Sequence, residues 1–141
     1  MTGQPQQSYP TPVVRIIVPD SAGRVLILKR RNTSSGMDSW CLPGGKVDYG
    51  NTVEETIRKE LQEETSLDCT SWRFLFWQDS LPAQGASMHC INLYFEGEVS
   101  GTVALNEESG EYAWIGPSEL SDYDIVFRND EALLRYWQDR R

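Results

Sequence analysis

Three glutamates, Glu60, Glu63 and Glu64, lie close together in the middle of the chain. A helix turns by about 100° per residue, and on that wheel Glu64 falls inside the apolar arc, Glu60 at its edge and Glu63 one step further round. Carboxylates so close to one another resist joint ionisation, and a divalent cation such as Mg²⁺ removes the repulsion. The spacing therefore predicts a metal-binding face. The alternative is a solvated acidic face on which Arg58 and Lys59 act as helix-pair partners.

The helix that carries these acids has a clear start. Thr52 and Glu55 have the spacing of a capping box, in which each side chain satisfies an unpaired backbone donor of the other residue. From Val53 onward, the apolar residues Val53, Ile57 and Leu61 recur every four positions along one side. The sequence thus predicts a helix from Val53 whose buried side also carries carboxylates.

Two glycines, Gly44 and Gly45, precede this helix. Glycine adopts backbone torsions that other residues avoid and lets the chain approach a ligand closely. A simple tight turn explains the same residues, and the two explanations are compatible. We expect a glycine bend beside the acids.

The stretch Gly44 to Leu67 resembles the box of the Nudix hydrolases, G-x5-E-x7-R-E-U-x-E-E-x-G-U, in which U is a bulky aliphatic residue. The positions that match in register are Gly45, Glu60, Leu61, Glu63, Glu64 and Leu67. The preceding residues, Trp40 to Gly45, are similar to the W-x-L-P-G-G entry of the same family. The resemblance covers the chain from about Val13 to its end.

Three box positions depart from the family pattern, since Asn51 replaces Glu, Lys59 replaces Arg and Ser66 replaces Gly. The first two form an acid–base pair in the family, and a hydrogen bond is the link expected to remain here. Ser66 is expected to take the left-handed turn at the helix end, which glycine adopts more easily. The box acids are intact, so the resemblance implies that metal binding is retained.

The resemblance implies a metal-dependent enzyme that hydrolyses a phosphoanhydride bond in a nucleoside diphosphate linked to another moiety. Its metal ligands would be Glu60, Glu63, Glu64 and Gly44, with Mg²⁺ as the cofactor and Mn²⁺ as a substitute. The catalytic acids would be Glu63, Glu64 and Glu108. Because Asn51, Lys59 and Ser66 differ from the family, the competing hypothesis is a Nudix-fold nucleotide-binding or sensing module with little hydrolysis.

Residues outside the helix complete the candidate site. Glu108 is preferred over Glu107 and Glu111 because the loop that contains them is similar to the family's region after the box, where an acid supplies a base or a further metal ligand. A solvated acidic loop is the alternative. The expected substrate contacts are Arg30, Arg31, Gly45 and Lys46. For the two arginines, the alternative is a solvated guard at a strand edge.

Composition limits the other classes of function. The chain has 141 residues, enough for one domain, and a formal charge of −8. The charge argues against general nucleic-acid binding but not against a nucleotide substrate, because a metal supplies local positive charge. No apolar run approaches membrane length. Three widely spaced cysteines suit a reducing cytoplasm, and a homodimer is compatible with the sequence.

The predicted fold class is α+β, a Nudix-type α/β/α sandwich with a mixed central sheet. Residues 1–11 are expected to be flexible and residues 12–141 to form a single domain. The predicted strands are Val13–Val18, Arg24–Lys29, Trp40–Leu42, Ser71–Trp77, Met88–Glu96 and Tyr112–Ile115. The first two are expected to pair as a hairpin. A last helix, Asp130–Asp139, is expected to be capped by Asn129, and Asp79–Ser87 is expected to form a mobile loop at the substrate site.

Overall fold

The structure is a computed structural model that describes residues 9–31, 39–82 and 88–140. Its strands and helices, in chain order, are β1 (Thr11–Ile17), β2 (Val25–Arg30), β3 (Ser39–Cys41), β4 (Gly44–Lys46), α1 (Val53–Thr65), β5 (Asp68–Ser80), β6 (Cys90–Ser100), β7 (Ser109–Ile115), the 3₁₀ helix η2 (Pro117–Asp122), β8 (Asp124–Ile125) and α2 (Asn129–Asp139). The first helix therefore begins at the residue that the sequence predicted.

The start and end of α1 follow from local sequence. The Thr52 hydroxyl accepts a hydrogen bond from the Glu55 N–H (3.0 Å), and the Glu55 carboxylate accepts one from the Thr52 N–H (2.8 Å). This capping box is confirmed. Ser66 ends the helix in the left-handed region at φ 65°, as expected of a residue at the glycine position of the box. Both ends of α1 are thus fixed by residues next to it in sequence.

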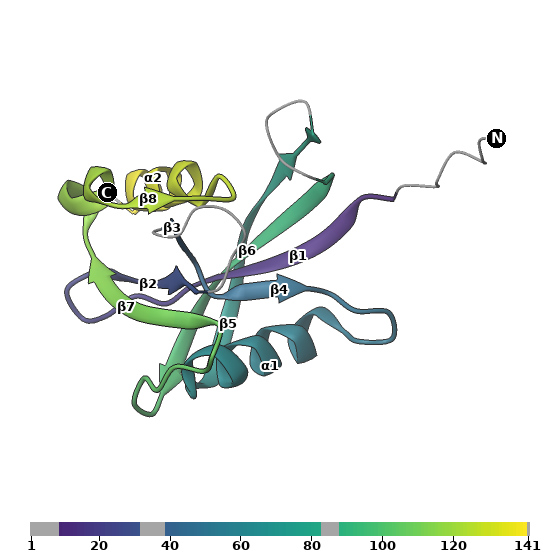
Figure 1. The fold of residues 1–141 in the computed structure, drawn as a ribbon, viewed down its shortest axis with the longest axis horizontal. Coiled ribbons are helices and arrows are strands. Elements are labelled where there is room, and N and C mark those ends of the chain that lie inside the picture. The colour runs from purple at the N-terminus through teal and green to yellow at the C-terminus, as the bar shows by residue number, and fades with distance from the viewer. Residues whose placement is uncertain (1–8, 32–38, 83–87, 141) are drawn as a thin grey trace.

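The strands form two four-stranded sheets, with orders β4-β1-β6-β5 and β7-β2-β3-β8. Each sheet is mixed, because β1 runs parallel to β6 and β3 runs parallel to β8, while the other pairs are antiparallel. The predicted α+β class with mixed sheets is confirmed. The strands are, however, divided between two sheets, and Figure 1 shows α1 and α2 on opposite sides of them.

Apolar side chains of β1 point alternately to its two faces and contribute to a separate core on each face. Val14 and Ile16 of β1 pack with Ile57 of α1 in one core. The next position, Ile17, packs with Leu133 of α2 in the other. Successive side chains on a strand point to opposite faces, so β1 contributes to both cores. The position of α1 against β1 and β4 follows from the first core.

The predicted hairpin between the first two strands is wrong. β1 and β2 belong to different sheets, and their backbones are linked only next to the turn, by a bridge between Pro19 and Val25 and by a hydrogen bond from the Leu26 N–H to the Val18 carbonyl (3.1 Å). Their β-branched residues correctly indicated strands. Strand propensity does not choose a partner, because a strand that is buried on both faces can pair with any neighbour that completes its ladder.

The predicted capping role of Asn129 is also wrong. Arg128 occupies the cap position, and none of its side-chain atoms caps the helix. Asn129 is fully buried as the first residue of α2, and its Oδ1 accepts a hydrogen bond from the Leu42 N–H (2.9 Å). The amide therefore ties α2 to the segment between β3 and β4 instead of serving its own helix.

Several predictions fall wholly or partly outside the described residues. The expected flexible segment 1–11 is described only from residue 9, and Thr11 already begins β1. The expected loop Asp79–Ser87 is described to residue 82, and its first two residues end β5. Within the described ranges, neither helix has the length and apolar character required to cross a membrane.

Candidate functional site

A large cleft, about 1100 Å³ in volume, opens where α1, β1, β2 and β4 come together. Nearly all the predicted site residues line it, namely Arg30, Arg31, Gly44, Gly45, Lys46, Glu60, Glu64 and Glu108. These residues lie far apart in the sequence, and the fold brings acidic and basic side chains to one cavity. Glu63, the remaining candidate, is exposed on α1 and does not line the cleft.

The glycine pair sits directly against the acids of α1. The Gly44 N–H donates a hydrogen bond to Oε1 of Glu64 (3.1 Å). A Cβ at Gly45 would lie 2.0 Å from Oε1 of Glu60, and one at Gly44 would lie 2.0 Å from the carbonyl oxygen of Val14. Gly44 also has φ +153°, which side chains rarely adopt. The predicted close approach is therefore an approach of β4 to the carboxylates on one side and to β1 on the other.

Burial and mutual repulsion disfavour the charged forms of the two cleft glutamates. Burial, with added repulsion from Glu60 and Glu108, raises the pKa of Glu64 to about 8, although the Gly44 N–H and Arg15 oppose the shift. Burial also raises the pKa of Glu60, with added repulsion from Glu63 and Glu108, while Lys59 and a hydrogen bond with Glu64 lower it. A cation among these groups would relieve both effects.

Carboxylate oxygens are suitable ligands for a hard divalent ion, so the donor set of the cleft fits the expected metal. Across residues 9–31, 39–82 and 88–140, however, no three acidic, cysteine or histidine side chains are gathered closely enough to hold an ion as they stand. Glu60 and Glu64 are the acids that face the cleft from α1. The assignment of Glu63 as a third ligand stays a prediction.

Basic side chains line the same cleft. Within the described part of the chain, the side chains of Arg30, Arg31 and Lys46 have no carboxylate partner, although the whole chain carries a charge of −8. The backbone N–H of Arg31 donates to the carbonyl of Glu108 (2.9 Å), which holds the Glu108 loop beside the end of β2. Cations without acidic partners leave their donors available to an anion.

Sequence reasoning missed Arg15, which also lines the cleft. Its Nη1 donates to the Leu42 carbonyl (3.1 Å), and its buried Nε has no hydrogen-bond partner among the described residues. The signal was present, since Arg15 interrupts the apolar run of β1, and charged residues are rarely buried without a partner. Its guanidinium group lies close enough to lower the pKa of Glu64.

The remaining acids of the region have other partners. Glu111 pairs with Lys29 (Oε2 to Nζ, 3.0 Å). Glu107 and Glu108 are both exposed, but of the three acids of this loop Glu108 is the one that lines the cleft. The hydrogen bond expected between Asn51 and Lys59 is not formed in the described structure. The Lys59 Nζ lies instead 3.7 Å from Oδ2 of Asp48.

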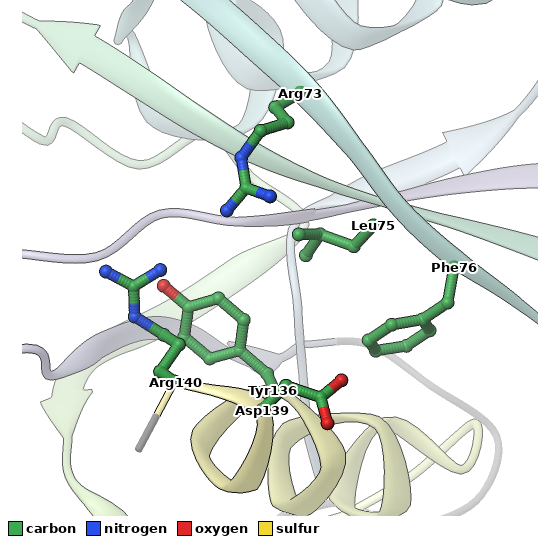
Figure 2. A pocket seen from close by; sticks show the side chains of 6 residues that line it. All are labelled: Arg73, Leu75, Phe76, Tyr136, Asp139 and Arg140. Atoms are coloured by element: carbon green, nitrogen blue, oxygen red, sulfur yellow. The ribbon is translucent and has the colours of Figure 1, made fainter.

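A second cavity, about 390 Å³ in volume, lies between β5 and α2. Figure 2 shows Tyr136 rising from α2 toward Arg73 of β5, with Arg140 beside it. Oε1 of Glu96 accepts a hydrogen bond from Arg73 (3.0 Å), and its Oε2 accepts one from Arg140 (2.8 Å). Because an internal carboxylate already satisfies the two arginines, this cavity has the features of a structural junction between sheet and helix.

Comparison with known proteins identifies a matching family and similar folds. The family model described as the NUDIX domain matches residues 9–136. A nucleoside triphosphatase NudI from Escherichia coli O139:H28 is 30% identical over 103 residues, which cover 67% of this chain and 73% of the relative. A relative with the same name from Salmonella paratyphi B is 30% identical over 95 residues, which cover 61% and 67%.

Solved structures show the same fold. The crystal structure of a MutT protein from Methanosarcina mazei Go1 aligns with a TM-score of 0.81 at 21% identity and covers 97% of this chain and 99% of that one. A MutT NUDIX hydrolase from Burkholderia pseudomallei aligns with a TM-score of 0.77 at 23% identity and covers 90% and 98%. At this level of sequence identity, the similarity shows that the helices and strands share the same arrangement.

Proposed function

Because the chain belongs to the NUDIX domain family and is a Nudix hydrolase, we propose that it cleaves a phosphoanhydride bond in a nucleoside diphosphate linked to another group, with Mg²⁺ as its cofactor. One observation supports the proposal above all others. Half-buried carboxylates on α1 line the same cleft as Arg30 and Arg31, which have no carboxylate partner among the described residues. The first group suits a cation and the second suits phosphate oxygens.

The linked group that we favour is phosphate, which makes the substrate a nucleoside triphosphate. Two relatives at 30% identity have the name nucleoside triphosphatase, and a nucleoside triphosphate is a member of the proposed class. A cleft of about 1100 Å³ is large enough for a nucleotide. Nucleoside diphosphates that carry other groups on the terminal phosphate are the remaining substrates to be tested.

The residues proposed to hold the metal are Glu60, Glu63, Glu64 and the carbonyl of Gly44. Bound there, Mg²⁺ would neutralise phosphate charge and lower the pKa of a coordinated water, and Mn²⁺ would substitute for it. The hydrogen bond from the Gly44 N–H fixes Oε1 of Glu64 and leaves the other carboxylate oxygen available.

The chain's own residues carry the remaining roles. Arg30, Arg31, Lys46 and the Gly45 backbone hold the phosphates, and Glu108 accepts the proton of the attacking water. Glu63 and Glu64 are the other proposed catalytic acids. The water oxygen bonds to a phosphorus atom, and the bridging P–O bond breaks, with the electron pair leaving on the departing phosphate. The products are two phosphorylated pieces, one of which carries the nucleoside.

The test is phosphate release from a panel of nucleotides with Mg²⁺, with Mn²⁺ and with EDTA. Glu64→Gln is expected to lower kcat by at least about 100-fold, the range typical of losing an essential ionised group, without lowering Tm. The matched control is Glu54→Gln, which changes an exposed acid of the same helix whose partner is Arg58 (3.2 Å). Equal turnover by Glu64→Gln and the parent would refute the assignment, and nucleotide binding without metal-dependent release would favour a binding module.

A further inference from the structure

Phe127 lies on the wall of the cleft between β8 and α2, and 41% of its surface is exposed. The Cζ atoms of Arg15 and Arg30 each lie 4.7 Å from the centroid of its ring. Both distances are within the range of a cation–π interaction. One aromatic ring therefore contacts two of the guanidinium groups that line the proposed phosphate-binding cleft.

The backbone at this point adopts an unusual conformation. Phe127 and the next residue, Arg128, have φ values of 62° and 58°, in the left-handed region that favours glycine. Such a conformation is strained for a residue with a side chain, so it persists only where the surrounding structure fixes it. Contacts around the turn must therefore hold the ring in its position.

Side chains from three elements, two of them fully buried and one half-buried, hold this turn. Asn129 Nδ2 donates to the Phe127 carbonyl (3.3 Å), and Gln78 Nε2 donates to the Arg128 carbonyl (3.0 Å). The hydroxyl of Tyr94 donates to Oε1 of Gln78 (3.0 Å) and accepts from Nδ2 of Asn129 (3.1 Å). Asn129 and Tyr94 are both fully buried. The network fixes both carbonyl groups of the turn and so fixes where the ring lies.

The two arginines have few other contacts. Within the described residues, the Arg30 side chain has no hydrogen bond or ion pair, and its contact is the Phe127 ring. Arg15 donates to the Leu42 carbonyl and lies near the Cys41 thiol and Glu64, but its buried Nε has no hydrogen-bond partner in that part of the chain. A long side chain with few partners has many rotamers, and ordering it on binding opposes affinity. A ring that orders both groups in advance reduces that loss.

We propose that Phe127 is a positioning residue that holds the guanidinium groups of Arg15 and Arg30 toward a bound polyphosphate. The inference rests on the proposed phosphate-binding role of the cleft and adds Arg15 to it. A cation–π contact uses none of the N–H donors of either guanidinium group. Apart from the Arg15 Nη1, which donates to Leu42, these donors stay available to phosphate oxygens. A carboxylate partner would order them equally well but would occupy those donors.

The experiment measures binding of inorganic pyrophosphate in excess Mg²⁺ by calorimetry, so the readout does not require turnover. Phe127→Leu is expected to weaken binding by about three- to ten-fold, the value of one or two such contacts, and Phe127→Tyr to stay within about two-fold of the parent. Phe127→Gly suits the left-handed backbone but lacks the ring, so it is expected to lose affinity as Phe127→Leu does, without loss of Tm.

Two further variants test whether the ring acts through the arginines. Phe74→Leu removes a phenyl group of similar exposure, 47%, that lies outside the cleft, and it is expected to leave affinity unchanged. In the Arg30→Ala background, Phe127→Leu is expected to lose at least half of its effect on log Kd.

The outcomes separate the two proposals. A parent protein that fails to bind pyrophosphate overturns the phosphate-binding cleft and the role of Phe127 with it. A parent that binds, together with Phe127→Leu and Phe127→Gly variants that bind equally well, overturns the positioning role alone. Affinity retained by Phe127→Gly but lost by Phe127→Leu would assign the effect to the backbone turn.

Discussion

Gly44 and Gly45 are neighbours on β4, yet a methyl group at each would meet a different neighbour. At Gly45, the Cβ would meet Oε1 of Glu60, the free end of a flexible side chain that can move aside. At Gly44, it would meet the carbonyl oxygen of Val14, which the β1 ladder holds in place, on a backbone at φ +153°. A substitution at Gly45 should therefore mainly affect activity, and one at Gly44 should mainly affect stability.

We expect Gly45→Ala to reduce kcat by about ten-fold or more, because it displaces a metal ligand by about an ångström, while Tm falls by only a few degrees. Gly44→Ala is expected to lower the free energy of unfolding by about 2–4 kcal/mol, because backbone atoms must shift. Thermal melts and initial rates with Mg²⁺ on both variants check this. A Gly45→Ala enzyme with the parent's rate would show that Glu60 does not need its present position.

At the scale of elements, Glu96 joins β6 to α2. Its carboxylate accepts hydrogen bonds from the Tyr136 hydroxyl (2.5 Å), from Arg140 (2.8 Å) and from Arg73 of β5 (3.0 Å). Burial alone would raise the pKa of Glu96, but the hydrogen bonds from Tyr136 and Arg73 and the charge of Arg140 hold it below its ordinary value. This junction forms the cavity shown in Figure 2.

The pKa of Glu96 is lower in the folded state than in the unfolded state, so the stability it contributes is present above the unfolded value of 4.5 and is lost as pH falls through the folded value. Glu96→Gln is expected to lower Tm at pH 7 by about 5 °C and to flatten the decline of stability below pH 4.5. Glu98→Gln, at an exposed position of the same strand, is the control. Identical melts of Glu96→Gln and the parent at pH 7 would contradict this assignment.

At the scale of the whole molecule, the buried Glu64 links folding to metal binding. Burial, with the charges of Glu60 and Glu108, raises its pKa from 4.5 to about 8. Between these values the folded state holds a proton that the unfolded state has released, so without metal the contribution of Glu64 to stability falls as pH rises toward 8. A metal needs the carboxylate and competes with that proton.

Mg²⁺ is therefore expected to raise Tm more at pH 9 than at pH 6, by mass action on the folded state. Melts in EDTA and in Mg²⁺ at both values of pH check this. In Glu64→Gln the pH-dependent part of the increase should disappear, whereas effects of the overall charge of −8 remain in both proteins. A metal-induced increase in Tm that is equal at both values of pH in the parent would show that Glu64 is not protonated in the metal-free fold.

The sequence by itself determined the features whose partners are neighbours in the chain. The capping box joins Thr52 to Glu55, and the left-handed Ser66 follows directly after α1. The spacing of Ile57 and Leu61 placed Glu64 toward the protein body, where it lines the cleft. Helical periodicity and capping act over one turn, so such residues can be interpreted without knowledge of the fold.

Only the tertiary structure decided which distant segments meet. β1 pairs with β6 and not with β2, and Asn129 bonds Leu42, 87 positions away, instead of capping its own helix. The contact of Phe127 with Arg15 and Arg30 depends on the same long-range packing, as does the amide network that holds its turn. Strand propensity and polar character indicate what a residue can do. Which partner it contacts depends on the free energy of the whole fold. That fold must complete the strand ladders, pair the buried polar groups and fill two cores at the same time.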